Sequence, residues 1–209
     1  MTTLYTMPGT CSLACNIAVA WIDAPVDIHN LAYGDHKNDE YLAINPKGKV
    51  PALQFDDGSV LTELSAIMAY LGAEHGGEGY ARDKQLGYRE AEALSYMTSE
   101  VHAAYGPHFA KQTFADSESA QEEVQQAAYK KLGNHYGRLE SNLKESGGEW
   151  YLGEQKSFAD AFLYVLTRWI EQTPLSLGDY PALKDHRSRM EADDGVKTAL
   201  ARQDMEAAG

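Results

Sequence analysis

The alternation of hydrophobic and polar positions in the first part of the chain predicts a small sheet with one crossover helix. Residues 2–7 alternate and are expected to form a strand, after which a Pro-Gly-Thr sequence turns the chain. Apolar residues then recur at helical spacing over 12–22, and a second strand is predicted over 26–29. These three elements together predict a βαβ unit.

A hairpin and a further helix are predicted next. Two short apolar runs, 52–55 and 60–62, flank an Asp-Asp-Gly turn, which is typical of an antiparallel hairpin. Helical spacing returns over 64–75, and a glycine-rich stretch then breaks the pattern. The order βαβ-ββα is typical of a thioredoxin-like domain, which we assign to residues 1–76, with residues 77–83 as a linker.

The rest of the chain, residues 84–209, has the pattern of an all-helical domain. Helices are predicted over residues 83–114, 119–145, 157–172, 181–191 and 193–206. The sequence from Ser157 to Asp160 resembles a helix capping box, with Asp in place of the usual Glu. The predicted fold class is therefore α/β plus all-α, with a C-terminal helical bundle.

Charge narrows the range of partners. The formal net charge of the 209 residues is -13 at pH 7, so the surface is expected to repel phosphate backbones and anionic headgroups. No apolar run reaches the roughly 18 residues that a membrane helix needs, and the first residues lack the features of an export signal. We expect a cytoplasmic protein that binds neither nucleic acid nor membranes.

The only two cysteines, Cys11 and Cys15, lie four residues apart at the start of the first predicted helix. This spacing is poor geometry for a disulfide. A thiol at the position of Cys11 is expected to favour the thiolate, because it lies near the N–H groups of a helix N-terminus. The sequence has no glycine-rich phosphate loop, no metal-spaced cluster of Cys and His, and no nucleophile-elbow motif, so we expect no metal.

Several segments together resemble the cytosolic glutathione transferases, and specifically the bacterial beta class, over nearly the whole chain. The segments are PGTCSLA (8–14), NPKGKVPAL (45–53), LTE (61–63), AIMAYL (66–71) and FADA (158–161). The first of them is the one that indicates the beta class. The resemblance implies glutathione as co-substrate with no further cofactor, a hydrophobic electrophile as second substrate, and a homodimer.

The resemblance also implies a set of residues around the glutathione sulfur. Cys11 would face the thiol of bound glutathione, and Ser12 and Tyr5 are rival hydroxyl donors, although Tyr5 has the position of a sheet aromatic. His102 matches a histidine that reaches the active-site sulfur in the family, but Ala103 stands where a lysine often follows it. We take Cys11, Ser12 and His102 as the catalytic candidates.

A second set of residues is implied to bind the glutathione backbone. Val50-Pro51 corresponds to a cis-proline corner whose backbone pairs with the tripeptide. Glu63, Leu64 and Ser65 correspond to the site for the γ-glutamyl end, where helix N–H groups suit its carboxylate and Glu63 suits its ammonium. The family has a small residue directly after the acid, so Leu64 is a departure.

The remaining candidates depend on position alone. Lys37 and Lys49 could offset the glycyl carboxylate, and Ser99 lies where the family reaches across a dimer interface. Trp169 could line the pocket of the second substrate, although core packing explains it at least as well, and Tyr105, Phe109 and Phe114 could form the wall of that pocket.

The predicted activity is conjugation of the glutathione thiol to electrophilic apolar molecules. An alternative reaction is thiol–disulfide exchange or reductive dehalogenation through Cys11, for which a single thiol suffices because the sequence lacks a Cys-x-x-Cys pair. A third possibility is a non-catalytic binding protein, which the departures at Leu64 and Ala103 favour and the retention of Cys11, Pro51, Glu63 and His102 opposes.

Overall fold

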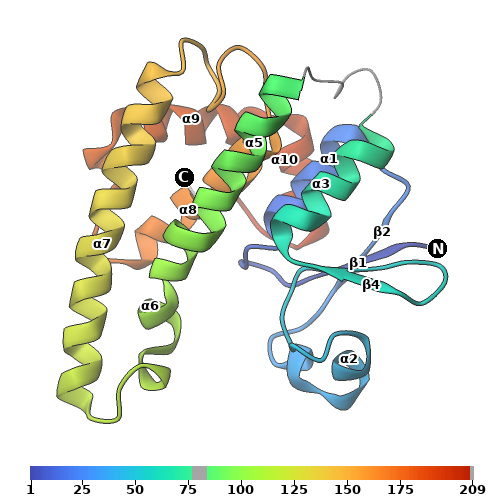
Figure 1. Cartoon of the computed structure of the whole chain (residues 1–209), viewed down its shortest axis with the longest axis horizontal. Coiled ribbons are helices and arrows are strands. Elements are labelled where there is room, and N and C mark those ends of the chain that lie inside the picture. The colour runs from blue at the N-terminus through green and yellow to red at the C-terminus, as the bar shows by residue number, and fades with distance from the viewer. Residues whose placement is uncertain (77–83, 208–209) are drawn as a thin grey trace. The chain divides into compact units, whose positions relative to one another are not determined.

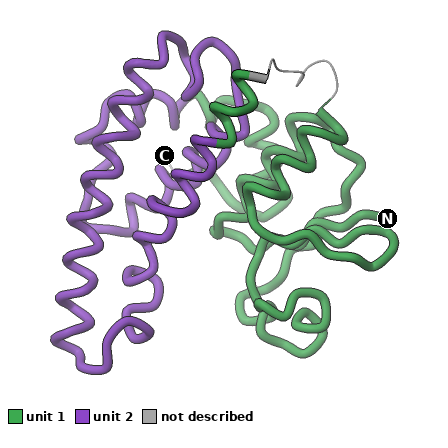
Figure 2. The backbone as a smooth tube through the Cα atoms, in the orientation of Figure 1, with its two compact units in different colours: residues 1–91, 189–209 green, residues 92–188 purple. Residues whose placement is uncertain are grey.

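The computed structural model describes residues 1–76 and 84–207, so the linker predicted over 77–83 lies outside the described residues. The chain forms two compact units (Figure 2). Unit 1 comprises residues 1–91 and 189–209, and unit 2 comprises residues 92–188.

Unit 1 contains a four-stranded mixed sheet in the order β2-β1-β3-β4. The strands are β1 (Thr3–Thr6), β2 (Asp27–Asn30), β3 (Ala52–Gln54) and β4 (Val60–Thr62). β2 runs parallel to β1, whereas β3 is antiparallel to both β1 and β4. This arrangement confirms the thioredoxin-like sheet, with strand bounds within about one residue of those expected from the sequence pattern.

The helices of unit 1 that pack against one another are α1 (Leu13–Ile22), α3 (Leu64–His75) and α10 (Asp194–Arg202) (Figure 1). Every residue of α1 from Leu13 to Val19 is buried, because α3 and α10 both contact it. That explains why its sequence, LACNIAVAWI, is apolar nearly all round. Two short elements, η1 (Asp35–Lys37) and α2 (Asp39–Ile44), connect β2 to β3, and Asn38 caps α2.

Unit 2 is helical, as predicted. Its elements are α5 (Lys84–Tyr96), which begins in unit 1, the π-helical segment Met97–His102, α6 (Gly106–Ala110), η3 (Lys111–Thr113), α7 (Glu118–Glu145), α8 (Phe158–Trp169), η4 (Ile170–Gln172), η5 (Leu177–Asp179) and α9 (Pro181–Ala192), which ends in unit 1. The single helix predicted over 83–114 is therefore divided. The break coincides with Gly106-Pro107, since proline disrupts a helix unless it stands in the first turn.

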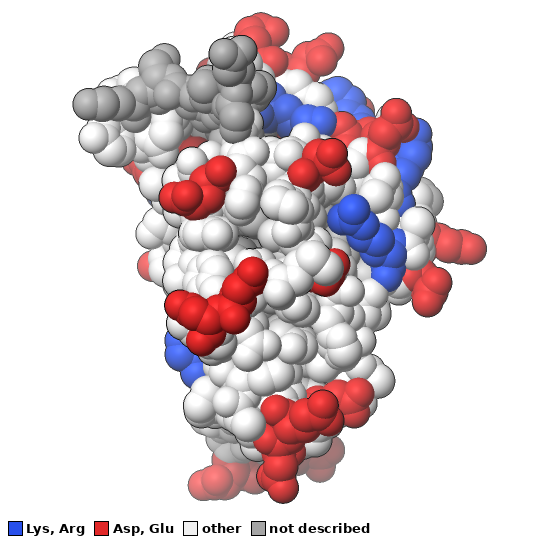
Figure 3. Space-filling model, turned by 90° about the vertical axis from the view of Figure 1, so that its right-hand side faces the viewer, with Lys and Arg blue, Asp and Glu red and all other residues white. Residues whose placement is uncertain are grey.

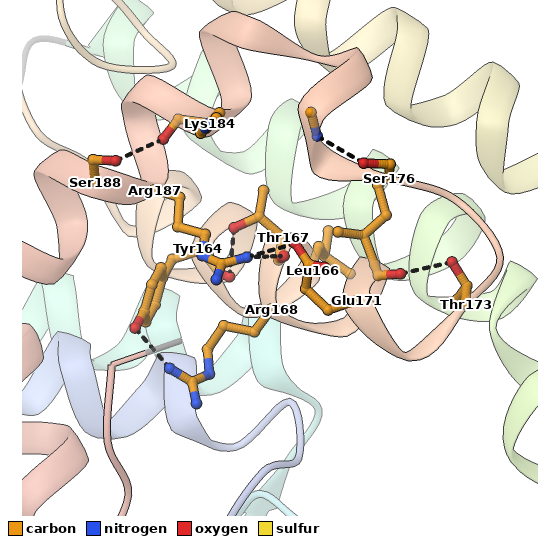
Figure 4. Close-up of polar contacts among 12 residues, drawn as sticks. Tyr164, Leu166, Thr167, Arg168, Glu171, Thr173, Ser176, Lys184, Arg187 and Ser188 are labelled. Carbon is orange, nitrogen blue, oxygen red and sulfur yellow. Dashed lines mark hydrogen bonds and ion pairs between the residues drawn. The ribbon is translucent and has the colours of Figure 1, made fainter. Parts of the chain in front are cut away.

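α8 forms the core of unit 2, and all but one of its twelve residues are buried. Ser157 and Asp160 form the expected capping box at its start. At its other end the buried Arg187 of α9 donates to the Thr167 carbonyl at 3.3 Å and to the Glu171 carboxylate at 3.1 Å (Figure 4). Arg168 instead donates to the Tyr164 hydroxyl at 3.0 Å. Charged side chains thus join the last turn of α8 to α9.

The last helix departs from the predicted division of the chain. The sequence pattern placed all residues from 84 onward in one helical domain, but residues 189–209 pack with unit 1. α10 lies against α1, where Trp21 Nε1 donates to Asp193 Oδ1 at 2.7 Å. A hydrophobic pattern identifies a helix and its buried face but does not identify the surface that the face covers, which is why this assignment could not be anticipated.

Candidate active site

The turn between β1 and α1 is held by hydroxyl groups. The Met7 amide donates to Ser12 Oγ at 3.0 Å, and Thr10 Oγ1 donates to the Met7 carbonyl at 2.8 Å. The hydroxyls of Thr10 and Ser12 are also hydrogen-bonded to each other at 2.7 Å. Ser12 is fully buried. Its hydroxyl is therefore engaged within the turn, which argues against the role of thiolate activator expected for it.

Cys11 follows this turn directly before α1, and its side chain is only 9% exposed. Its Sγ donates to the Val50 carbonyl at 3.5 Å. Burial raises the pKa of the Cys11 thiol to about 12, and the Glu63 carboxylate also raises it, whereas the Cys11 backbone amide and the Lys49 ammonium act in the opposite direction. The expected thiolate is thus not the form of Cys11 in the free protein at neutral pH. Helix-terminal N–H groups do lower the pKa, but desolvation outweighs them.

Cys15 lies one turn further along α1 and is fully buried, as expected for a core residue. Both cysteines are free, which confirms the expectation that they form no disulfide.

The bond between Val50 and Pro51 is cis, as expected. Pro51 is buried, and Val50 is half-buried with its carbonyl next to the Cys11 sulfur. Within the residues that the structure describes, the Val50 amide has no hydrogen-bond partner. It is a backbone donor that an extended ligand can use.

The start of α3 presents a charged side chain and unpaired backbone donors. Glu63 precedes the helix with φ at 73°, a conformation that residues other than glycine seldom adopt, and its side chain is exposed. Its side chain does not cap the helix, and among the described residues no other side chain accepts a hydrogen bond from the first N–H groups of α3. Leu64 is buried and Ser65 is half-buried. The Leu64 side chain is therefore part of the core, and its backbone amide belongs to the free helix end.

Lys47 is a residue that the sequence analysis did not select. Its ammonium lies 2.6 Å from the Glu63 carboxylate and donates to Thr62 Oγ1 at 2.8 Å. Lys47 and Lys49 stand two residues apart in one loop. The sequence pattern does not indicate which of them faces the start of α3. In this structure the Lys47 ammonium is paired with the Glu63 carboxylate, which by the resemblance would bind the ammonium of the ligand.

The remaining candidates of unit 1 lie in different surroundings. The Tyr5 hydroxyl donates to Gln54 Oε1 at 3.2 Å and its ring contacts His29 and Tyr41, which agrees with the expectation of a sheet aromatic. Lys37 donates to the Gly48 carbonyl at 3.0 Å and thus braces the loop before the cis-proline. Lys49 is exposed and close enough to Cys11 to lower the pKa of its thiol.

His102 belongs to unit 2 and ends the π-helical segment. Its ring lies 5.2 Å from the Trp169 ring and 5.9 Å from the Phe162 ring, measured between centroids. Such π-helical segments are frequent at functional sites. His102 lies in unit 2, whereas Cys11 lies in unit 1.

Tyr105 and Trp169 are both buried within an aromatic cluster. Tyr105 stacks on Phe109 at 5.6 Å and meets Trp169 edge-on at 5.3 Å. Its hydroxyl is bonded to that of Tyr136, so its polar group is used inside unit 2. Phe109 is half exposed and contacts both Tyr105 and Trp169. Of the three aromatic residues expected to form the wall of that pocket, Tyr105 is buried, whereas Phe109 and Phe114 offer accessible aromatic surface.

Ser99 is exposed on the π-helical segment, and its hydroxyl donates to the Ser95 carbonyl at 2.8 Å. Among the described residues, no group of His, Cys, Asp and Glu is arranged to hold a metal ion. In the same part of the chain, no helix combines the length and the apolar character needed to cross a membrane.

Two family models match the chain. Residues 9–74 match the N-terminal domain of glutathione S-transferases, and residues 95–194 match the C-terminal domain. A glutathione S-transferase of Xanthomonas campestris is 31% identical over 202 residues, which cover 94% of this chain and 96% of that protein.

Solved structures agree with the family models. A beta-class glutathione S-transferase from Sphingomonas chungbukensis superposes with a TM-score of 0.82 at 33% identity, covering 96% of this chain and 98% of that one. A sphingomonad glutathione S-transferase in complex with glutathione gives a TM-score of 0.84 at 31% identity, covering 97% and 98%. The chain, with its thioredoxin-like sheet followed by helices, belongs to the glutathione S-transferase family.

Proposed function

We propose that the protein conjugates the thiol of glutathione to electrophilic apolar molecules, with the tripeptide bound on unit 1. The observation that carries this proposal is the start of α3, where the exposed Glu63 carboxylate stands beside uncapped helix N–H groups. This pair of opposite charges suits the zwitterionic γ-glutamyl end of glutathione. The Leu64 side chain lies in the core and offers no hydroxyl, so the backbone N–H groups of this helix end are the proposed donors to the carboxylate.

The backbone around the cis-proline supports the rest of the binding mode. The Val50 amide is unpaired within the described residues and can donate to the tripeptide backbone. Lys49 is exposed close to Cys11, so its ammonium can attract the glycyl carboxylate. Lys37 braces the Gly48 carbonyl and acts by shaping the loop instead of touching the ligand.

The protonation state of Cys11 favours conjugation over exchange. A thiol whose pKa is raised to about 12 by burial stays protonated at neutral pH, so it is a poor nucleophile. A protonated thiol can donate a hydrogen bond, and here it would donate to the glutathione sulfur instead of the Val50 carbonyl. After its proton has passed to water, that sulfur attacks the electrophilic carbon as the thiolate. A C–S bond forms, and the leaving group departs with the electron pair of the bond that breaks.

Exchange through Cys11 remains the second candidate, because its sulfur lies beside the backbone that would hold glutathione. The two reactions are separated by Cys11→Ala. Conjugation should persist in this variant with a reduced rate. Formation of a mixed disulfide, in which Cys11 attacks added glutathione disulfide and releases one glutathione thiolate, should disappear. Complete loss of both activities, with glutathione binding intact, would favour Cys11 as the nucleophile.

The second substrate is proposed to contact unit 2. Phe109 is half exposed and lies against Trp169, and Phe114 is also half exposed, so aromatic surface is available to an apolar electrophile. His102 packs on the same Trp169 ring, and we retain it as a candidate for contact with the reacting molecule.

The charge distribution supports the proposed partners. On the face in Figure 3, carboxylates and cations are both scattered, and the described atoms form no continuous basic band. Together with the net charge of -13, this favours a small-molecule substrate over nucleic acid. A homodimer in the cytoplasm, taking part in detoxification, completes the proposal.

Calorimetric titration of glutathione into wild type, Glu63→Gln and Glu100→Gln tests the site. Glu100 is the matched control, since it is also an exposed carboxylate paired with a lysine, Lys131. Removing the partner of the ligand ammonium should weaken binding about tenfold in Glu63→Gln, as expected for one charge-assisted hydrogen bond, and leave Glu100→Gln unchanged. Absence of binding in folded wild type would support the non-catalytic alternative.

A further inference from the structure

The segment that follows α10 folds back toward the β1–α1 turn. The Gln203 and Met205 amides both donate to the Leu200 carbonyl at 3.0 Å, and Asp204 between them adopts a left-handed φ of 51°. This reversal brings the Met205 side chain to the turn, where the Gly9 amide donates to Met205 Sδ at 3.2 Å. We call residues Gln203–Met205 the strap.

The strap is anchored to unit 1 by the end of α10. Arg202 Nη1 donates to Asn16 Oδ1 of α1 at 3.2 Å, and the Arg202 carbonyl accepts a hydrogen bond from the Asn30 amide group at the end of β2. All of these residues belong to the same compact unit, so the position of the strap is set by the fold of unit 1 itself.

The contact lies two residues from Cys11 along the chain. The inner side of the turn is held by the Thr10 and Ser12 hydroxyls, which bond to Met7. Gly9, in contrast, is exposed and has a positive φ of 76°, so its conformation is the adaptable part of the turn. Met205 contacts the turn at this adaptable residue.

Two features of the strap are energetically unfavourable. Gln203 is 3% exposed, yet both polar atoms of its side chain lack hydrogen-bond partners within the described residues. Burying an amide without partners is unfavourable, and so is a left-handed conformation at Asp204. A segment with such penalties opens more readily than the helix to which it is attached.

We propose that Met205 is a positioning residue for Cys11: the strap fixes the Gly9 turn two residues before Cys11, and its release loosens that turn and raises the accessibility of the Cys11 thiol. This inference rests on the proposed function for its meaning, because Cys11 is the thiol placed beside the glutathione sulfur. Met205 touches no reacting atom and acts only through the turn. Its thioether is a weak acceptor, so most of its effect comes from filling the space beside Gly9.

The test compares chains that end at Met205 and at Asp204, together with the full-length variants Met205→Ala and Met205→Leu. Alkylation of Cys11 by iodoacetamide is followed by mass spectrometry, with the fully buried Cys15 as internal control. The chain ending at Asp204 and Met205→Ala both lack the Met205 side chain. In both, easier local opening should raise the rate of Cys11 alkylation about fivefold. The chain ending at Met205 and Met205→Leu should stay close to wild type.

Equal Cys11 rates in all chains would overturn the proposal, and so would a parallel rise for Cys15, which would indicate general loosening. Iodoacetamide labelling does not require glutathione, so this outcome is independent of the proposed function. Failure of the proposed function would appear separately, as an absence of protection of Cys11 by added glutathione in every chain.

Discussion

At the scale of single residues, the environment of Cys11 decides its chemistry. A helix N-terminus favours a thiolate, but the side chain is 9% exposed and burial raises the pKa of its thiol to about 12. Position along the sequence suggested the first effect, and only the packing could reveal the second. The same holds for Leu64, which the sequence marks as a departure from the family and which only the packing shows to be a core residue.

The raised pKa predicts a steep pH dependence for the reaction of Cys11 in the free protein. Because only the thiolate reacts, the alkylation rate should increase about tenfold per pH unit from pH 7 to 10 without reaching a plateau. Stopped-flow or quench measurements with iodoacetamide would follow this, with circular dichroism confirming the fold at each pH. A plateau below pH 9 would contradict the burial argument.

At the scale of elements, the helix termini explain which predictions succeeded. Ser157 and Asp160 were identified as a capping box because their types and spacing satisfy the N-terminal N–H groups, a local rule. The helix predicted over 83–114 was wrong in its interior, because the apolar spacing continues through Gly106-Pro107 while the backbone does not. Capping residues therefore predicted where a helix begins, whereas hydrophobic periodicity alone did not predict where the helix is interrupted.

Asp160 should be far less tolerant of change than its partner in the capping box. Its carboxylate is fully buried and accepts from the Ser157 amide and hydroxyl, the Tyr151 amide and His186 Nε2, at 2.7–2.9 Å. In Asp160→Asn an amide NH₂ must face donors in either orientation, so we expect a loss of about 3–5 kcal/mol in the free energy of unfolding. Ser157→Ala should cost about 1 kcal/mol. Urea denaturation of both variants would check the order, which equal midpoints would contradict.

Glu140 of α7 caps the start of α9, and its contribution to stability should depend on pH. Its carboxylate accepts from the Ala182 and Leu183 amides at 3.1 and 2.9 Å and pairs with Lys144 at 2.7 Å. Burial alone would raise the pKa of Glu140, but these hydrogen bonds outweigh it and hold the pKa below its usual value. The stabilisation is therefore complete above the unfolded pKa of about 4.3 and is lost as the pH falls through the lower folded value.

Glu140→Gln should accordingly lower the free energy of unfolding by about 1–3 kcal/mol at pH 7, with a difference from wild type that narrows below about pH 4. The exposed Glu145 on the same helix provides the control, since Glu145→Gln should leave stability unchanged at either pH. Thermal unfolding at pH 7 and pH 3.5 would measure both. A constant difference at the two pH values would count against the capping role.

At the scale of the whole molecule, the compact units do not follow the order of the chain. Residues 189–209 complete unit 1, although nearly a hundred residues of unit 2 separate them from its sheet. The helical pattern of α10 was visible in the sequence, but its partner α1 was not, because many apolar helix faces could cover it. The folding of unit 1 thus depends on a long-range contact that can be tested directly.

The same substitution by alanine at Gly195 in α10 and at Gly137 in α7 tests this contact, because it should change the free energy of unfolding in opposite directions. A Cβ at Gly195 would lie 2.4 Å from Trp21 Cδ1 of α1, so Gly195→Ala must push the helices apart or displace the indole from its hydrogen bond to Asp193. At Gly137 in α7 a Cβ would meet nothing within 4 Å, and Gly137→Ala should raise stability by about 0.5–1 kcal/mol through helix propensity. Gly195→Ala should instead lower it by about 1–3 kcal/mol, the usual cost of overpacking. Tryptophan fluorescence during denaturation would report both; a stabilising Gly195→Ala would mean that α10 is not seated on α1.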